Sequence, residues 1–175
     1  MTLLIETDRL SLRPVELGDF DKLTALWRNT DFTRYIVGRA LTDEEIWFRL
    51  LRDLGHWNAL GIGNWSVHNR EDGAYVGSVG ILNYRRAVQP SMEDPELGWG
   101  VNPAYQGQGM AREALRAVLQ WADANLSAHR TICMIGPDNT PSIRLANAVG
   151  YRPWVQTEYG GKSVILYERA RAQVD

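Results

Sequence analysis

Residues 106–111 carry the residue types that bind a phosphate group, in the order Gln106, Gly107, Gln108, Gly109, Met110 and Ala111. A strand-like stretch, residues 96–101, precedes this segment, and helical spacing of apolar residues starts at its end. The first turn of a helix leaves backbone N–H groups without partners and adds partial positive charge, so anions bind there. We therefore predict a phosphate site in residues 106–111. The alternative is an ordinary strand-to-helix turn eased by glycine.

Two common phosphate-binding patterns do not fit this segment. No lysine follows the glycines, as a P-loop requires, and Arg112 stands where a dinucleotide-binding turn has a small residue. That turn also belongs to an early strand–helix–strand unit, whereas this segment lies late in the chain. A nicotinamide-dependent oxidoreductase is therefore the weakest of the possible interpretations.

The strand before the turn indicates an extended ligand. Its side chains alternate, so that Glu96, Gly98 and Gly100 share one face and larger apolar residues share the other. Glycine inside a strand often marks the close approach of a ligand. We predict that a ligand lies along the glycine face, with its phosphates at the following helix and Glu96 near its other end. A helix packed on the glycines is the alternative.

The elements that position these residues follow from periodicity, capping and turn residues. We predict strands in residues 9–15, 63–72, 73–85, 95–101, 130–136, 151–159 and 162–169, and helices in 17–28, 42–57, 111–122 and 137–150. Residues 29–41 are expected to form a loop. In the second helix, the residues expected on the buried face are Trp47, Leu50, Leu51, Leu54 and Trp57.

Composition narrows the class of protein. The chain has 175 residues, of which 45% are hydrophobic, and this suits a single domain over residues 1–175. A net charge of −2 gives no overall field for nucleic acid, and no apolar run approaches the roughly 20 residues of a membrane span. Without a signal-peptide pattern, we expect a soluble cytoplasmic protein. The three histidines are scattered, so we predict no metal site, and the single cysteine, Cys133, is expected to be an inert core thiol.

Two blocks of the sequence together resemble the GNAT superfamily of N-acetyltransferases. Residues 106–111 match its pattern of Gln or Arg, two residues, Gly, one residue, then Gly or Ala. The segment DNTPSIRLANAVGY is similar to its Asn-x-x-Ser, helix, Gly-aromatic block at Asn139, Ser142, Gly150 and Tyr151. The opening IETDRLSLRPVELGDF resembles the RimJ/RimL branch of ribosomal-protein N-terminal acetyltransferases. The Asn-Ala pair before Val149 departs from the Glu-Lys of many branch members, which concerns helix packing more than chemistry.

The resemblance implies a fold and a co-substrate. The fold belongs to the α/β class and is of the α+β kind, with a mixed, mostly antiparallel seven-stranded sheet and about four helices. Its halves splay apart between residues 96–101 and 131–136. The co-substrate is acetyl-coenzyme A, whose pyrophosphate the amides of residues 106–111 would bind. Its pantetheine arm would lie in the gap, beside the backbone of Trp99 and Val101, with Asn139 and Ser142 as further contacts.

The implied reaction moves an acetyl group from a thioester to an amine. The amine attacks in its neutral form, so a general base is needed, directly or through a water. We expect Glu96 to be that base, and Glu158 in the late hairpin is the second candidate. The backbone around Trp99 and Val101 is the expected donor to the thioester oxygen. Ser142 resembles the serine that protonates the leaving thiolate in the related branch; a local backbone hydrogen bond is the alternative.

The acceptor remains open between a protein N-terminus and a small-molecule amine. Its pocket is expected from the first two helices, the loop between them and the late hairpin, with Trp27, Arg34, Tyr35, Trp57 and Tyr159 as lining. Arg34 and Arg39 are candidates for binding an acidic acceptor. A non-catalytic module that binds coenzyme A is the alternative function, and turnover with an amine discriminates between the two. Seven tryptophans also raise the idea of an aromatic surface and a homodimer.

Overall fold

The computed structural model describes residues 3–172. Eight strands form one sheet: β1 (Ile5–Glu6), β2 (Leu10–Pro14), β3 (Asn64–Asn69), β4 (Tyr75–Leu82), β5 (Glu96–Val101), β6 (Arg130–Ile135), β7 (Arg152–Tyr159) and β8 (Lys162–Ala170). Five α-helices accompany them: α1 (Phe20–Trp27), α2 (Thr30–Thr33), α3 (Asp43–Leu60), α4 (Met110–Asn125) and α5 (Thr140–Ala148). Short 3-10 turns, η1 (Leu17–Asp19) and η2 (Pro103–Tyr105), precede α1 and α4. The predicted class is confirmed, with one more strand and one more helix than expected.

The two additional elements are too short to carry a periodic signal. β1 has two residues and pairs with β2, while α2 has four residues inside the segment expected to be a loop. Asn29 starts α2 because its side-chain oxygen accepts the N–H of Asp31 at 2.9 Å. In so short a segment, the residue types do not distinguish a helical turn from a loop. The sequence therefore does not predict α2.

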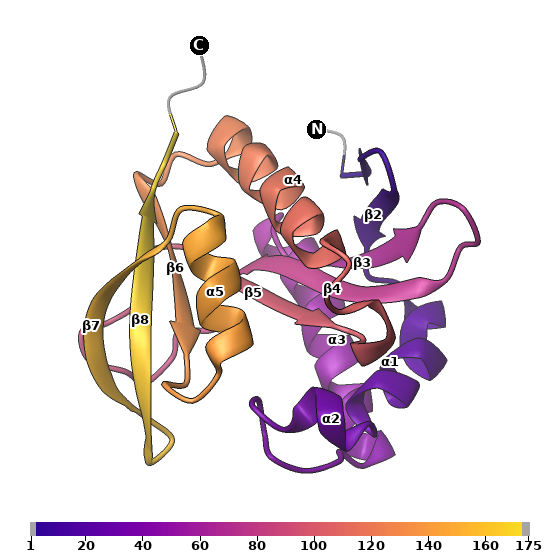
Figure 1. The fold of residues 1–175 in the computed structure, drawn as a ribbon, viewed down its shortest axis with the longest axis horizontal. Coiled ribbons are helices and arrows are strands. Elements are labelled where there is room, and N and C mark those ends of the chain that lie inside the picture. The colour runs from indigo at the N-terminus through magenta and orange to yellow at the C-terminus, as the bar shows by residue number, and fades with distance from the viewer. Residues whose placement is uncertain (1–2, 173–175) are drawn as a thin grey trace.

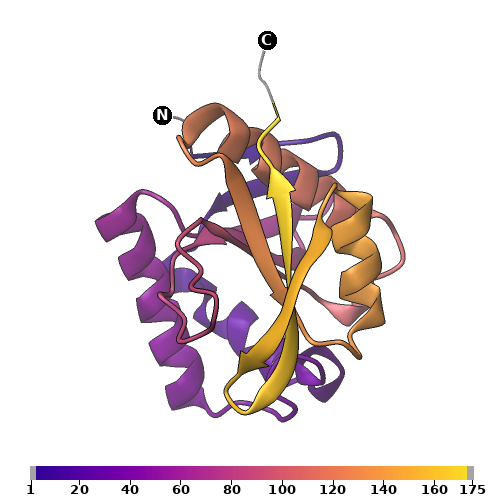
Figure 2. The same ribbon diagram turned by 90° about the vertical axis from the view of Figure 1, so that its left-hand side faces the viewer.

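The sheet is mixed, and it opens in the middle. Its order is β1-β2-β3-β4-β5-β6-β8-β7, with only β5 and β6 parallel (Figure 1). These two strands share one register pair, Glu96 with Ile132, and then diverge. Figure 2 shows β6 and β8 side by side, with the β7–β8 hairpin forming the outer part of this half. The splayed gap predicted between residues 96–101 and 131–136 is confirmed.

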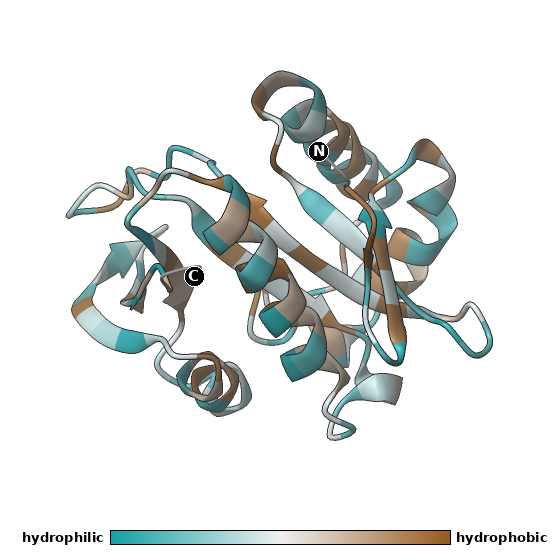
Figure 3. Cartoon of the chain, turned by 90° about the horizontal axis from the view of Figure 1, so that it is seen from above, coloured by the Kyte–Doolittle hydropathy of each residue, from teal (hydrophilic) through white to brown (hydrophobic). Residues whose placement is uncertain are grey.

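Helices cover both faces of the larger half of the sheet. In Figure 1, α4 lies in front of β4 and α3 lies behind it. The face under α4 holds the main core, in which fully buried side chains from α4 and the strands pack together: Leu10, Trp65, Ile81, Leu115 and Val118. The central strands in Figure 3 carry brown, hydrophobic segments, and teal, hydrophilic residues prevail in the outer turns. Apolar burial of this kind is the main driving force that holds the site in place.

Helix α3 begins as predicted, but its buried face differs in part from the predicted one. Thr42 and Glu45 form the expected capping box. The buried side chains are Ile46, Leu50, Asp53 and His56, whereas Trp47 and Leu51 are 38% and 42% exposed. The predicted buried face was therefore wrong at those two positions. An apolar pattern around most of a helix leaves its rotation undecided, and here a polar pair takes the inner face.

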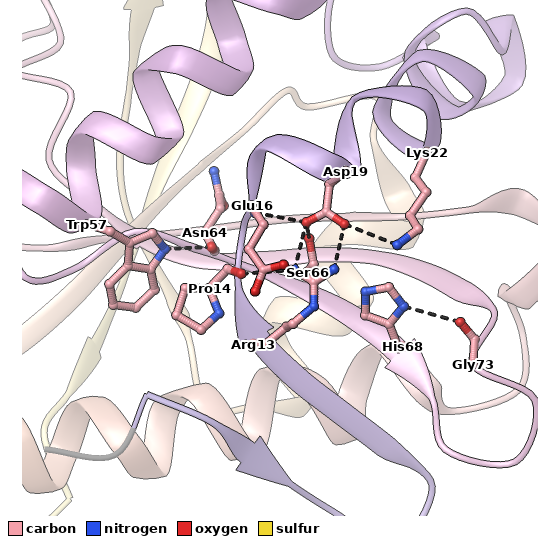
Figure 4. Close-up of polar contacts among 10 residues, drawn as sticks. All are labelled: Arg13, Pro14, Glu16, Asp19, Lys22, Trp57, Asn64, Ser66, His68 and Gly73. Carbon is pink, nitrogen blue, oxygen red and sulfur yellow. Dashed lines mark hydrogen bonds and ion pairs between the residues drawn. The ribbon is translucent and has the colours of Figure 1, made fainter.

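A buried carboxylate joins the first helical segment to the sheet. Asp19, at the end of η1, is 0% exposed and accepts hydrogen bonds from Arg13 on β2 and Ser66 on β3 (Figure 4). Lys22 and the Glu16 N–H add two further donors. These contacts bind the η1–α1 segment to two neighbouring strands, and so set the position of one wall of the site.

Two of the seven tryptophans are buried, four are half-buried and one is exposed. Trp47 alone among the seven is exposed, while Trp57, Trp65 and Trp121 form a stack of edge-to-face rings in the core. One tryptophan, Trp47, thus remains on the surface, and the homodimer stays a prediction. Within residues 3–172, no helix has the length and apolar composition that a membrane span requires.

Candidate active site

The glycine-rich turn has the backbone shape of an anion cradle. Gly107 and Gly109 have φ angles of +74° and +77°, a region that side-chain-bearing residues rarely adopt. Gln106 and Gln108 turn their side chains back to donate to the carbonyls of Val101 and Ala104, at 3.1 and 3.0 Å. In the described part of the chain, no acceptor is found for the N–H groups of residues 107–112. This arrangement fits a pyrophosphate, which needs several donors at a helix start.

A clamp from the N-terminal strand region holds this turn. Arg9 donates to the carbonyl of Gln108 at 3.0 Å and forms an ion pair of 2.6 Å with Glu113 in the first turn of α4. Thr7 donates to the same carboxylate at 2.6 Å. No local sequence pattern indicates this clamp, because its partners lie about a hundred residues apart. Its effect is to hold the turn in one conformation before any ligand binds.

Two adjoining cavities define the site. The first, which we call the turn cavity, has a volume of about 680 Å³ and is lined by the glycine-rich turn, β5, α2 and the start of α5. The second, the inner cavity, has a volume of about 570 Å³ and lies between β3–β5, α1–α3 and the β7–β8 hairpin. Trp99, Gly100, Asn139 and Ser142 line both. Both volumes fall in the range of small-molecule sites.

The open edge of β5 supplies backbone donors between the cavities. The N–H of Asn102 donates to Val76 of β4, and strand residues alternate in the edge to which their polar groups point. Trp99 and Val101 therefore direct their N–H groups toward the gap, where β6 pairs only with Glu96. Backbone donors at the meeting point of the cavities are what an acyl oxygen requires.

The face that carries the two glycines is not bare. A Cβ atom on Gly100 would lie 2.7 Å from the ring of Phe32, and one on Gly98 would lie 2.9 Å from Leu82. The glycines thus make room for side chains from α2 and β4, and the prediction of an uncovered backbone was wrong. Phe32 and Leu82 themselves line the inner cavity, so this face still forms part of the site.

Helix α5 presents two of the predicted residues at the junction of the cavities. Asn139 is its N-cap and accepts the Ser142 N–H at 3.2 Å. The Ser142 hydroxyl has no hydrogen-bond partner among residues 3–172, and the alternative of a local backbone bond through this hydroxyl finds no support there. Ser142 can therefore direct a proton donor into either cavity.

Glu96 lies in the wall of the inner cavity and is held by an arginine. Its side chain is buried, and Arg86 donates to its two oxygens at 2.7 and 2.8 Å. Burial alone lowers the pKa of Arg86, but the bonds to Glu96 raise that pKa above its ordinary value. The guanidinium also lies over the rings of Tyr84 and Tyr159. A carboxylate oxygen has two lone pairs, so Glu96 keeps sites for a water or a ligand.

Other predicted residues separate into two groups. Trp27, Tyr35 and Tyr159 line the inner cavity, as expected for an acceptor site. Glu158 is exposed and lies outside both cavities, because successive residues of β7 point to opposite faces and Tyr159 takes the inner one. The structure thus brings Glu96 and Ser142 to one site and leaves Glu158 outside it.

Two of the predicted lining residues, and one candidate for binding an acidic acceptor, lie outside the inner cavity. Trp57 does not line either cavity; its indole N–H donates to the carbonyl of Asn64 at 2.7 Å in the core. Arg39 pairs with Glu45 as part of the α3 cap, away from both cavities. Arg34 lines the turn cavity rather than the inner one and pairs with Asp31. Arg34 and Arg39 each pair with a neighbouring carboxylate, and Trp57 donates to a backbone carbonyl.

Several polar residues of the inner cavity were missed by the sequence analysis. They come from α3, from the segment after β4 and from the β7–β8 turn: Arg49, Arg52, Asp53, Tyr84, Arg86 and Lys162. The one available signal was the i, i+3 and i+4 spacing of charged residues at 49, 52 and 53, which face the same side of a helix. On a predicted amphipathic helix that spacing is typical of a solvated face, so it does not by itself indicate a site.

The predicted core thiol is confirmed. Cys133 is 1% exposed, and its burial raises the pKa of the thiol well above its ordinary value. Such a thiol is a poor nucleophile, because the thiolate is the reactive form. Within residues 3–172 no group of three or more histidine, cysteine, aspartate or glutamate side chains is placed to hold a metal ion.

Comparisons with known proteins agree with this geometry. Residues 9–152 match the family model described as an acetyltransferase (GNAT) domain. The uncharacterized N-acetyltransferase YnaD of Bacillus subtilis is 28% identical over 85% of this chain and 82% of its own. The ribosomal protein uS5-alanine N-acetyltransferase of Escherichia coli is 27% identical over 84% of this chain and 77% of its own. A solved structure of a GnaT-family acetyltransferase from Bordetella pertussis superposes with a TM-score of 0.85 and 32% identity, covering 97% of this chain and 100% of that one.

Proposed function

Since the chain belongs to the GNAT family and is an acetyl-coenzyme A-dependent N-acetyltransferase, we propose that an amine in the inner cavity takes the acetyl group directly, with Glu96 as base. The observation that supports this most is the meeting of the two cavities at the open edge of β5. One cavity adjoins the phosphate-type turn and the other holds a carboxylate. The two substrates would therefore meet within a single complex.

Acetyl-coenzyme A supplies the activated acetyl group as a thioester. The free N–H groups of residues 107–112 fit its pyrophosphate, and Asn139 and the edge of β5 fit the arm that follows. The N–H groups of Trp99 and Val101 stabilise negative charge that develops on the acyl oxygen. These donors cost no reorganisation during the reaction, because β5 is held by β4 along its other edge.

Two side chains of the protein move the protons. As the new carbon–nitrogen bond forms and the carbon–sulfur bond breaks, the amine loses a proton and the sulfur gains one. Glu96 accepts the first through a water or directly, and the Ser142 hydroxyl provides the second. Arg86 keeps the carboxylate of Glu96 in place and stays charged throughout. The acceptor is an amine on a protein or on a small molecule.

Two-substrate kinetics test the direct transfer. Initial rates measured at several fixed acceptor concentrations are expected to give intersecting double-reciprocal lines, as a ternary complex requires. Parallel lines and a trapped acetyl-enzyme would instead indicate a covalent intermediate. Cys133→Ala is the matching variant, and we expect it to retain activity, since this thiol is buried and protonated.

Ligand binding provides a separate check on the turn. Saturating coenzyme A at about 100 times its Kd adds about 2.7 kcal/mol to the free energy of unfolding. For a chain of this size we expect a rise in Tm of roughly 5–10 °C. Binding without turnover toward any amine would support the non-catalytic alternative.

We further propose that residues 1–175 form one catalytic domain that acts in the cytoplasm.

A further inference from the structure

The inner cavity carries more positive than negative charge. Four of its lining side chains are cationic, Arg49, Arg52, Arg86 and Lys162, and two are carboxylates, Asp53 and Glu96. Both carboxylates are already neutralised, because Arg52 pairs with Asp53 at 2.8 Å and Arg86 pairs with Glu96 at 2.7 Å. Arg49 and Lys162 are therefore the two cations of the lining that have no carboxylate partner within it.

Arg49 is the cation of greatest interest, because it is half-buried and has no partner. Its guanidinium lies over the ring of Trp27 at 4.0 Å, a contact that holds the plane of the group. Among residues 3–172, no carboxylate pairs with it and no oxygen accepts a hydrogen bond from it. Burial, followed by the like charge of Arg52, lowers the pKa of Arg49. A half-buried arginine without a partner has five N–H donors available for an anion.

Coenzyme A does not account for this arginine. The turn cavity, which adjoins the phosphate-type turn, is lined by Arg34 and Arg112 and not by Arg49. Arg49 lines only the inner cavity, on the side of α1 and α3 that holds Trp27. An anion bound by Arg49 would therefore belong to the other substrate.

We infer that the acceptor is an amine that also carries an anionic group, a carboxylate or a phosphate, which Arg49 binds in the inner cavity. The inference rests on the proposed function and defines its acceptor class. Arginine binds such groups with two parallel hydrogen bonds, which orient as well as attract. Lys162, the exposed first residue of β8, lines the same cavity and adds a second positive charge. A polyamine has the opposite requirement, since its additional ammonium groups would face unpaired cations.

Matched acceptor pairs test the inference. We would compare kcat/KM for a series of amino acids, from glycine to 6-aminohexanoate, with that of their uncharged amides, and add 2-aminoethyl phosphate and spermidine. The acid is expected to exceed its amide by at least about tenfold, in keeping with a charge-assisted hydrogen bond. The rate with 2-aminoethyl phosphate, compared with the rates of the amino acids, shows whether the site prefers a phosphate or a carboxylate. Equal rates for acid and amide, or a preference for spermidine, would overturn the inference.

Variants assign the effect to one side chain. Arg49→Gln is expected to lower kcat/KM for the anionic acceptor by roughly 10- to 100-fold, mainly through KM, and to change that for the amide by less than about twofold. Arg116→Gln, on the exposed face of α4 and outside both cavities, is the matched control and should change neither. An equal loss for acid and amide in Arg49→Gln would indicate a structural role and contradict the inference.

Calorimetry separates this inference from the proposed function. Binding of 6-aminohexanoate and of hexylamine is measured in the presence of coenzyme A, without turnover. Tighter binding of the amino acid, lost in Arg49→Gln, supports the anion site even if no acetylated product forms. Turnover of neutral amines together with equal binding of the two ligands leaves the acetyltransferase function in place and rejects the anion site.

Discussion

Two buried carboxylates, Asp19 and Glu96, are each held by both arms of an arginine, yet their surroundings differ. Asp19 is 0% exposed and accepts from five donors: two nitrogens of Arg13, Lys22, Ser66 and the Glu16 N–H. Glu96 is 7% exposed, lines the inner cavity and accepts only from Arg86 among the described residues. A carboxylate has about four acceptor positions, so Asp19 is saturated and Glu96 is not.

The difference supports the roles proposed for the two carboxylates, a structural one for Asp19 and a reactive one for Glu96. Burial by itself raises the pKa of Asp19, but the hydrogen bonds from Arg13, the Glu16 N–H, Ser66 and Lys22 outweigh burial and lower that pKa well below its ordinary value. A group so fully bonded has no site left for a proton from a substrate. Glu96 has the same arginine fork but accepts from no other donor among the described residues, and it lines the inner cavity. The number of free lone pairs therefore distinguishes the two sites better than burial does.

The largest effect is expected from Glu96→Gln. Loss of the base should lower kcat by about 10²–10⁴-fold, with little change in the KM for acetyl-coenzyme A. Steady-state rates at saturating acetyl-coenzyme A provide the measurement, and Glu158→Gln is the matched control, because Glu158 is exposed and outside both cavities. A larger loss in Glu158→Gln than in Glu96→Gln would exchange the roles of the two residues.

Asp19→Asn is expected to act on stability instead. Replacing the charged partner leaves Arg13 with only the more distant carboxylate of Glu16, at 3.6 Å, as a counter-charge, and we expect a cost of about 3–5 kcal/mol in the free energy of unfolding. Urea denaturation measures this value. Asp21→Asn, an exposed residue on α1, should change stability by less than about 0.5 kcal/mol. If Asp19→Asn is as stable as Asp21→Asn, the hydrogen-bond network of Asp19 in Figure 4 does not stabilise the fold.

Lysine in place of each arginine sharpens the comparison. Lysine keeps the charge but loses the two-pronged geometry. Arg13→Lys should lower the free energy of unfolding by about 1–2 kcal/mol and leave kcat unchanged, whereas Arg86→Lys should lower kcat by roughly tenfold with a smaller change in stability. Each variant is measured for both properties. The same pattern in both variants would remove the distinction between the two carboxylates.

The smallest expected effect is a change in the free energy of unfolding at acidic pH. Because the pKa of Asp19 is lowered on folding, its contribution to stability is complete above the unfolded pKa, ≈ 3.9, and declines as the pH falls toward the folded value. The stability gap between the wild type and Asp19→Asn should therefore narrow by about 1 kcal/mol between pH 7 and pH 3. Denaturation curves at the two pH values test this. A gap that stays constant or widens would contradict the assignment.

Local chemistry explains which parts of the site the sequence predicted well. The turn at residues 106–111, the N-cap at Asn139 and the capping box at Thr42 depend on neighbours within a few positions. Parallel pairing of β5 with β6 also followed, because a helical crossover joins them. The sequence did not predict short elements such as α2. It also did not predict the rotation of α3, which buries Asp53 and exposes Trp47.

The inner cavity could not be predicted for a different reason. Arg86 reaches Glu96 from an irregular segment, and Arg49 reaches the same cavity from α3. Nothing in their local sequence distinguishes them from the arginines that pair on the surface, such as Arg28 with Asp43. The partner that each arginine finds depends on how the helices pack against the sheet, and packing is a property of the whole chain.

The amino-acid sequence by itself determined the class of the sheet, the phosphate-type turn and the candidate base on β5. These features depend on backbone conformation and on periodicity, which residues close in the chain control. Tertiary structure alone decided that Asp19 is saturated, that Glu96 is open to a ligand and that Arg49 is left without a partner among the described residues. Charges and donors brought together from distant segments set those outcomes, because burial removes the water that would otherwise satisfy each group.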